Sequence, residues 1–295
     1  MTGTDTAAAE LRPPGTGYVE VDGRLVRIRR AGTGEPLLLL HGIGRSLEDW
    51  SEQFDRLGDR FALIALDLPG FAHSDRLPQA ATLEAYAAFL PRLLDALGVH
   101  GPVHVAGNSL GGAVAMTLAA SRPDSVRSLV LASSAGFGRE VTLALRLLAI
   151  PPIGRRLLVP SRDASARAER SIFVDRTLAT DDRVAWGLAL ASRPDHATTL
   201  LEVARSLGTF RGVRPRWRRR LLERLATLQI PTLVLWGEGD RVLPAAHLPA
   251  AAVALPSAET HLFAGTGHMP QIERPDAFAD LVSAFLERHP IGGDR

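Results

Sequence analysis

The chain has 295 residues, of which 46% are hydrophobic and 22% charged, as in an ordinary globular protein. The net charge is only +2, and all 34 basic residues are arginine, which indicates a coding bias rather than a nucleic-acid footprint, so we expect no nucleic-acid partner. The absence of cysteine excludes disulfides, cysteine metal sites and a cysteine nucleophile.

Residues 1–16 carry acidic side chains and no apolar segment, which predicts a flexible tail rather than a secretory signal. No apolar run approaches the roughly 18 residues that span a bilayer, so we expect a cytoplasmic protein without a membrane segment. The first predicted elements are two alternating runs, residues 18–21 and 25–28. They flank Asp22-Gly23, a dipeptide typical of a two-residue hairpin turn.

Strands and helices then alternate. Continuous apolar runs predict strands at residues 36–40, 61–66, 103–106 and 126–131. Helical spacing predicts helices at residues 50–57, 83–97 and 111–120, the second capped by Thr82 and Gly98. Because strands without alternation are buried on both faces, we predict an α/β fold with a mostly parallel, doubly wound central sheet.

The alternation stops after residue 138. Helical stretches at residues 141–149, 183–191 and 198–207 follow, separated by prolines and without a convincing strand. Strands resume at residues 232–236 and 260–263, and an amphipathic helix at about 276–288 ends the chain. We therefore predict one core, residues 17–138 and 229–295, interrupted by an all-helical cap, residues 139–228.

The strand at residues 103–106 leads into a Gly-x-Ser-x-Gly turn, Gly107 to Gly111, with Ser109 at its apex. A reversal from strand to helix over so few residues forces the apex residue towards positive φ, and the two glycines remove the clash that a second side chain would cause. This pattern is typical of a nucleophile elbow, although a glycine-rich turn with an incidental serine has the same letters.

A serine nucleophile needs a base, and the base needs a carboxylate to orient it. Asp240 follows the strand at residues 232–236, and His268 follows the strand at residues 260–263. The carboxyl ends of parallel strands meet at one edge of the sheet, where ligands bind. Ser109, Asp240 and His268 are therefore our candidate catalytic residues.

From about residue 17 to residue 289 the sequence resembles the α/β-hydrolase superfamily, in its branch with a helical cap after the sixth strand. The resemblance rests on five motifs in order, which are His41-Gly42-Ile43-Gly44, residues 67–74, residues 107–112, residues 236–240 and Gly267-His268. It implies an α/β-hydrolase fold and an oxyanion hole formed by the backbone N–H groups of Ile43 and Leu110. Serine at position 109 argues against the dehalogenases and epoxide hydrolases, which use a carboxylate nucleophile.

Other side chains compete for these roles. The alternative bases are loop, strand or helix histidines, namely His41, His73, His100, His247 and His261. The alternative acids are Glu238, which we expect to be solvated, and Asp67, which we expect to be structural. His41 is expected to form structural hydrogen bonds near the oxyanion loop.

These residues predict a hydrolase of carboxylic esters or similar small acyl compounds that needs no cofactor or metal. Two alternatives stay open. One is a carbon–carbon bond hydrolase of ring-cleavage products, although Ile43-Gly44 and Met269 depart from the pattern of those relatives. The other is a ligand-binding non-enzyme on the same fold. Leu143, Leu147 and Ile150 could line an acyl pocket or form cap core. The oligomeric state and the substrate-binding residues are not readable from the sequence.

Overall fold

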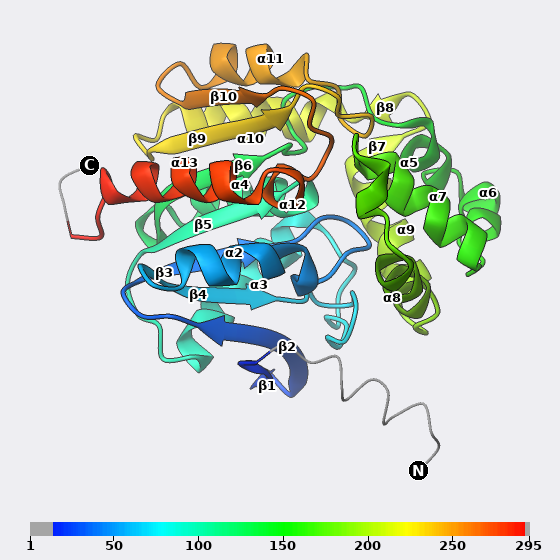
Figure 1. Cartoon of the computed structure of the whole chain (residues 1–295), viewed down its shortest axis with the longest axis horizontal. Coiled ribbons are helices and arrows are strands. Elements are labelled where there is room, and N and C mark those ends of the chain that lie inside the picture. Colours follow the sequence, from blue (N-terminus) through cyan, green and yellow to red (C-terminus); the bar gives the residue numbers. More distant parts are fainter. Residues whose placement is uncertain (1–13, 293–295) are drawn as a thin grey trace.

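The computed structural model describes residues 14–292, which form an eight-stranded sheet with helices on both faces (Figure 1). The strands are β1 (Thr16–Val21), β2 (Arg24–Ala31), β3 (Glu35–Leu40), β4 (Phe61–Leu66), β5 (Val103–Asn108), β6 (Val126–Ala132), β9 (Thr232–Gly237) and β10 (Glu259–Phe263). The helices of the core are α2 (Ser51–Leu57), α3 (Leu83–Ala96), α4 (Leu110–Ser121), α11 (His247–Ala254), α12 (Pro270–Glu273) and α13 (Pro275–Glu287). Short 3-10 helices are η1 (Leu47–Trp50), η2 (Pro123–Ser125) and η3 (Arg176–Leu178).

The sheet has the order β1-β2-β4-β3-β5-β6-β9-β10 and is parallel from β4 to β10. The antiparallel hairpin β1–β2 lies at one edge. Asp22 and Gly23 both have positive φ, 51° and 73°, as the two-residue turn requires. The predicted fold class and hairpin are confirmed. The predicted tail lies outside the described residues as far as residue 13, and β1 begins at Thr16.

The apolar runs supply both faces of the sheet because successive strand residues point to opposite sides. In β3, Leu37 and Leu39 pack with α2 and α13, whereas Leu38 and Leu40 pack with α3 and α4. All four leucines are fully buried. A continuous apolar strand of this kind is stable only between two helical layers, as the sequence predicts.

The second helix agrees with its predicted caps. The side chain of Thr82 accepts a hydrogen bond from the N–H of Ala85 at 3.2 Å, which satisfies one free amide of the first turn of α3. At the other end, Gly98 has a φ of +70°, so it reverses the chain after the helix.

The insertion between β6 and β9 contains α5 (Leu143–Leu148), α6 (Pro151–Leu157), α7 (Arg162–Ile172), α8 (Asp181–Ala191), α9 (His196–Leu207) and α10 (Pro215–Ala226). Helices α5 to α9 lie beyond the carboxyl ends of the strands (Figure 1). The prediction of an all-helical insertion is wrong in one detail, because the insertion also contains a short antiparallel pair, β7 (Gly208–Thr209) and β8 (Gly212–Val213). The pair is too short to leave an alternating pattern in the sequence. Helix α10 packs against α4 of the core.

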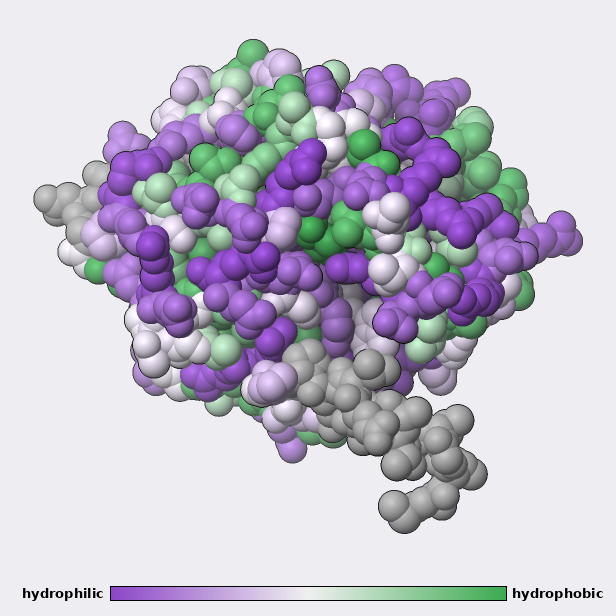
Figure 2. Space-filling model, viewed as in Figure 1, coloured by the Kyte–Doolittle hydropathy of each residue, from purple (hydrophilic) through white to green (hydrophobic). Residues whose placement is uncertain are grey.

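The surface is mostly polar. Figure 2 shows hydrophilic side chains over much of one face, with smaller hydrophobic areas between them, one of them on the side of α5 and α6. Leu143, Leu157 and Val159 are exposed in that part of the chain. Within residues 14–292, none of the helices combines the length and the apolarity needed to cross a membrane.

Candidate active site

Ser109 lies in the short turn between β5 and α4, with a φ of 55° and a ψ of −113°. This left-handed conformation is rare for a residue with a side chain. A Cβ atom on Gly107 would lie 2.3 Å from the carbonyl carbon of Gly111, and one on Gly111 would lie 2.1 Å from the carbonyl oxygen of Leu40. The two glycines therefore permit the close backbone approach that the turn needs, as the sequence predicts.

Asp240 and His268 meet above the carboxyl ends of β9 and β10. The Nδ1 atom of His268 lies 2.7 Å from Oδ2 of Asp240, and both side chains are buried. The other carboxylate oxygen of Asp240 accepts hydrogen bonds from the N–H groups of Val242 and Leu243, at 2.8 and 2.9 Å. A carboxylate held in this way accepts a hydrogen bond from Nδ1–H of the ring, which leaves the lone pair on Nε2.

One cavity of about 310 Å³ is lined by both Ser109 and His268. The loop after β3 reaches the same place, because a Cβ atom on Gly42 would lie 3.4 Å from Cβ of Ser109. Ile43 of that loop lines the cavity. Leu110 is the first residue of α4, so its N–H is one of the amides that a helix leaves without an internal partner. The predicted residues thus come from four separate loops to one edge of the sheet.

Asn108 joins two of these loops. Its side-chain amide donates hydrogen bonds to the carbonyl oxygens of His268 and Ala132, at 3.0 and 3.1 Å, and the side chain is buried. The residue before the nucleophile candidate therefore fixes the backbone of the histidine candidate. No periodicity or spacing in the sequence predicts this contact, because it joins residues that are 160 positions apart.

The competing side chains have structural partners. The Nδ1 of His41 donates to the carbonyl oxygen of Gly42 at 2.7 Å, and its Nε2 accepts the N–H of Leu68 at 2.9 Å. Burial lowers the pKa of His41 to about 4, so this ring is neutral. Asp67 is fully buried in an ion pair with Arg27, with 2.7 Å between its Oδ2 and the arginine Nε.

The remaining alternatives lie away from the Ser109 elbow or have other partners. His73 stacks on Trp186, and His247 is the first residue of α11 with its Nε2 3.2 Å from Glu140. Glu238 is exposed and accepts the N–H of Gly265. The cavity described above is not lined by His73, His247 or Glu238.

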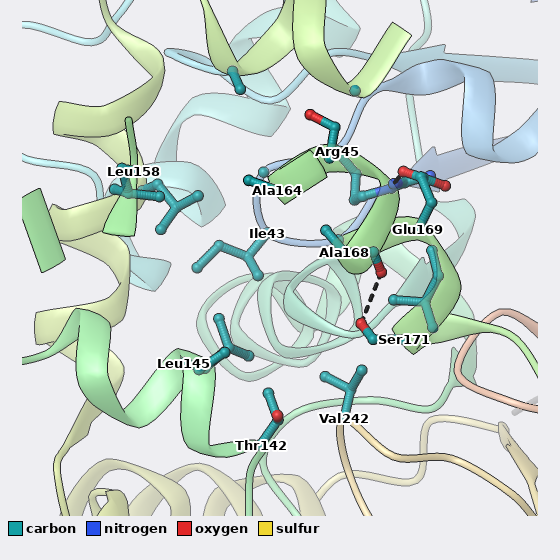
Figure 3. A pocket seen from close by; sticks show the side chains of 18 of the residues that line it. Ile43, Arg45, Thr142, Leu145, Leu158, Ala164, Ala168, Glu169, Ser171 and Val242 are labelled. Atoms are coloured by element: carbon teal, nitrogen blue, oxygen red, sulfur yellow. Dashed lines mark hydrogen bonds and ion pairs between the residues drawn. The ribbon is translucent and has the colours of Figure 1, made fainter. Parts of the chain in front are cut away.

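The cap supplies most of the cavity wall (Figure 3). Its apolar lining includes Leu145 and Leu158, and Leu157 and Val159 both line it and are exposed, so the cavity opens beside them. Three apolar cap residues proposed from the sequence as possible lining do not line this cavity, namely Leu143, Leu147 and Ile150, and Leu143 is exposed. Leu145 of the same helix faces the cavity instead.

Arg45 carries a positive charge at the cavity wall, but two carboxylates compensate it. Its guanidinium pairs with Asp49 at 2.7 Å and with Glu169 of α7 (Figure 3). Burial alone lowers the pKa of Arg45, but the two carboxylates raise it overall, so the arginine stays charged. The cluster of Arg45, Asp49 and Glu169 has a formal charge of −1 and joins the core to the cap.

His196, the first residue of α9, also lines the cavity and is missing from the sequence-based candidates. Burial lowers its pKa to about 4, which keeps the ring neutral. Its Nδ1 is buried and has no hydrogen-bond partner among the described residues. Between residues 14 and 292, no three histidine or acidic side chains come together as a metal site.

Comparison with known proteins places these features in context. The sequence model of the alpha/beta hydrolase family matches residues 37–281. The dihydrolipoyllysine-residue acetyltransferase component of the acetoin cleaving system of Cupriavidus necator is 34% identical over 99% of this chain and 73% of that protein. A 2-hydroxy-6-oxononadienedioate/2-hydroxy-6-oxononatrienedioate hydrolase of Comamonas testosteroni is 29% identical over 88% of this chain and 91% of its own. The solved structure of a meta-cleavage product hydrolase from Pseudomonas fluorescens IP01 is similar with a TM-score of 0.80 at 25% identity, covering 93% of this chain and 98% of that one.

Proposed function

The chain belongs to the alpha/beta hydrolase family, and from that premise we propose that it cleaves carboxylic esters or similar small acyl compounds. Ser109 attacks the substrate carbonyl while Nε2 of His268 takes the hydroxyl proton. The protonated His268 then gives this proton to the leaving alcohol, and the acyl group stays on Ser109. Water, deprotonated by His268, releases the acid and restores the serine. Asp240 holds the imidazole in the working tautomer and stabilises its protonated form.

One observation carries this proposal. His268, whose Nδ1 lies 2.7 Å from Oδ2 of the buried Asp240, lines the same cavity as the strained Ser109. A serine in an unfavourable backbone conformation that shares a cavity with an oriented imidazole is an arrangement suited to nucleophilic catalysis. A purely structural turn gains nothing from that strain.

The N–H groups of Ile43 and Leu110 are proposed to bind the oxyanion of the tetrahedral intermediate. The amide of Leu110 is fixed at the start of α4, and the loop of Ile43 packs against Ser109 through Gly42. Donors fixed before the charge develops cost no reorganisation during the reaction, and losing one typically costs about 10²–10³ in rate.

The cavity favours uncharged acyl groups over the substrates named for some relatives. A dienedioate carries two carboxylates, and each would need a cationic partner. Arg45 is the arginine at the cavity wall, and Asp49 and Glu169 already compensate it. Placing a substrate carboxylate beside the cluster of Arg45, Asp49 and Glu169, whose formal charge is −1, is electrostatically unfavourable. The acetyltransferase name of the Cupriavidus relative is compatible with the acyl intermediate proposed here.

We assign residues 17–138 and 229–295 to the catalytic core and residues 139–228 to a cap. The segment from α5 to α9 supplies apolar wall on the side of the cavity away from the sheet. The cap therefore selects the acyl or alcohol group, whereas the core performs the chemistry.

The carbon–carbon hydrolase alternative retains support from relatives such as the Comamonas enzyme. Purified protein should be assayed with a short p-nitrophenyl ester and with a coloured dienol ring-fission product. We expect turnover of the ester. Strong turnover of the dienol without any ester cleavage would reverse the choice.

Ser109→Ala tests the mechanism itself. We expect kcat to fall by roughly 10⁶-fold, the scale seen when a triad nucleophile is removed. Ser121→Ala, at the exposed end of the same helix, is the matched control and should leave kcat unchanged. A fluorophosphonate probe should label Ser109 in the wild type and in the control only. An activity that survives Ser109→Ala, or labelling elsewhere, would show that the mechanism is wrong.

A further inference from the structure

The loop that carries His268 is held by the cap as well as by the core. The segment of residues 172–175, which begins with the last residue of α7, lies directly against this loop. The N–H of His268 donates to the carbonyl oxygen of Ile172 at 2.7 Å. This bond joins the backbone of the proposed base to a residue from the cap, 96 positions earlier in the chain. The position of His268 therefore depends on where the cap lies.

Glu273 binds both sides of this junction. One oxygen of its carboxylate accepts the N–H of Gly267 at 2.6 Å, and the other accepts the N–H of Val174 at 2.9 Å. The second oxygen also lies 3.4 Å from the N–H of Asp175. A single carboxylate thus satisfies amides from the histidine loop and from the cap, and it adds to the bond between His268 and Ile172.

The packing at the junction leaves no room for a side chain. A Cβ atom on Gly267 would lie 2.5 Å from the carbonyl oxygen of Ile172 and 2.7 Å from Oε1 of Glu273. A Cβ atom on Gly239, next to Asp240, would lie 2.5 Å from Cγ2 of Val174. The cap segment 172–175 is therefore in close contact with the loop that carries Asp240 and with the loop that carries His268.

The chemistry of Glu273 suits this role because an ionised carboxylate is an acceptor only, with room for several N–H donors. Glu273 is half-buried, and burial raises its pKa overall, although the hydrogen bonds from Val174, Gly267 and Asp175 and the charge of Arg274 oppose the shift. Hydrogen bonds to a charged acceptor are stronger than neutral ones. A glutamine at this position has only one acceptor oxygen, so it could hold one of the two segments but not both.

We propose that Glu273 is a positioning residue that couples the cap to His268, so that the base is aligned with Ser109 only while the cap segment 172–175 is docked. This inference rests on the proposed function, since it assigns a partner to the proposed base. At metal sites, the outer hydrogen-bond partners that orient a ligand typically affect activity by about 10–100-fold. Moving a catalytic group by about 1 Å from its working position can lower the rate by about 10²-fold.

The test compares Glu273→Gln with Glu238→Gln as the control. Glu238 accepts one loop amide, that of Gly265 at 3.1 Å, and is bonded neither to the cap nor to the histidine. We expect Glu273→Gln to lower kcat by about 10–100-fold with KM changed less than about threefold. The control should keep both constants within about twofold of the wild type, because exposed polar contacts contribute little.

A spectroscopic readout separates alignment from general damage. The proton in the 2.7 Å bond between His268 and Asp240 should give a strongly downfield NMR resonance in the wild type and in Glu238→Gln. The resonance should broaden or disappear in Glu273→Gln. If Glu273→Gln does not fold, Glu273→Asp takes its place, since its shorter side chain keeps the charge but cannot reach both amides.

The outcomes distinguish this inference from the proposed function. A wild-type protein that neither cleaves esters nor reacts with a fluorophosphonate at Ser109 contradicts the proposed function. An active wild type whose Glu273→Gln and Glu273→Asp variants match the control in kcat and in the His268 resonance overturns the role of Glu273 alone. A rise in KM with kcat unchanged would also overturn it, because the contact would then serve binding.

Discussion

The backbone strain at Ser109 should be measurable as stability that a glycine recovers. Ser109 has a φ of 55° and a ψ of −113°, where a Cβ atom is disfavoured and glycine is not. Such strain costs of order 1–3 kcal/mol. Glycine also increases the conformational entropy of the unfolded chain, which lowers the stability of the glycine variant by about 0.5–1 kcal/mol relative to alanine. Ser109→Gly should therefore be more stable than Ser109→Ala by about 1 kcal/mol, although both variants lack the hydroxyl.

Ser121 provides the matched control, because it is the last residue of the same helix, with an ordinary helical environment. There the order should reverse, with Ser121→Ala more stable than Ser121→Gly by about 0.5–1 kcal/mol. Urea unfolding of the four variants, compared at equal m-values, measures both differences. If Ser109→Gly is less stable than Ser109→Ala by the same margin as the two variants of Ser121, the backbone at Ser109 is not strained.

Three further predictions concern buried groups. Asp67→Ala should destabilise the protein by about 3–5 kcal/mol in urea unfolding, because the buried Arg27 keeps only Glu48 as its partner and the N–H groups of Leu47 and His73 lose their acceptor; a loss below 1 kcal/mol would contradict this. Burial lowers the pKa of His196 to about 4 in the folded protein. Between pH 6.5 and 4 the unfolded chain therefore binds more protons than the folded one, and the free energy of unfolding decreases as the pH is lowered. From pH 7.5 to 5 this loss is about 2 kcal/mol, and His196→Leu should remove it from the measured pH dependence. Gly112→Ala should cost about 1–3 kcal/mol despite better helix propensity, since its Cβ would lie 2.3 Å from Oγ of Ser134; Ser134→Gly should restore most of the loss.

Local patterns in the sequence were sufficient to predict the core of this fold. A run such as Leu37 to Leu40 can be buried only if both faces of its strand are covered, and the structure places α2 and α13 on one face and α3 and α4 on the other. The turn from Gly107 to Gly111 was equally readable, because the close approach of its backbone excludes any other residue type at the two glycines.

The order of the candidate residues followed from the same logic. Ser109, Asp240 and His268 each follow a strand, and parallel strands deliver their carboxyl ends to one edge of the sheet. Chain position therefore carried the information about spatial proximity for these three residues. Helix orientation in the cap did not follow in the same way. Leu143 and Leu145 are two residues apart on α5, and only packing decided which of them faces the cavity.

The sequence by itself determined the sheet, the elbow and the candidate nucleophile, acid and base, because each depends on a local pattern of a few residues. The tertiary structure alone decided the contacts that tie these groups together. Asn108 reaches the carbonyl of His268, Arg45 pairs with Glu169, and Glu273 binds the cap at Val174. These partners are 99 to 160 positions apart. Several of the bonds end on backbone atoms, which every residue possesses, so no residue type in the sequence marks them.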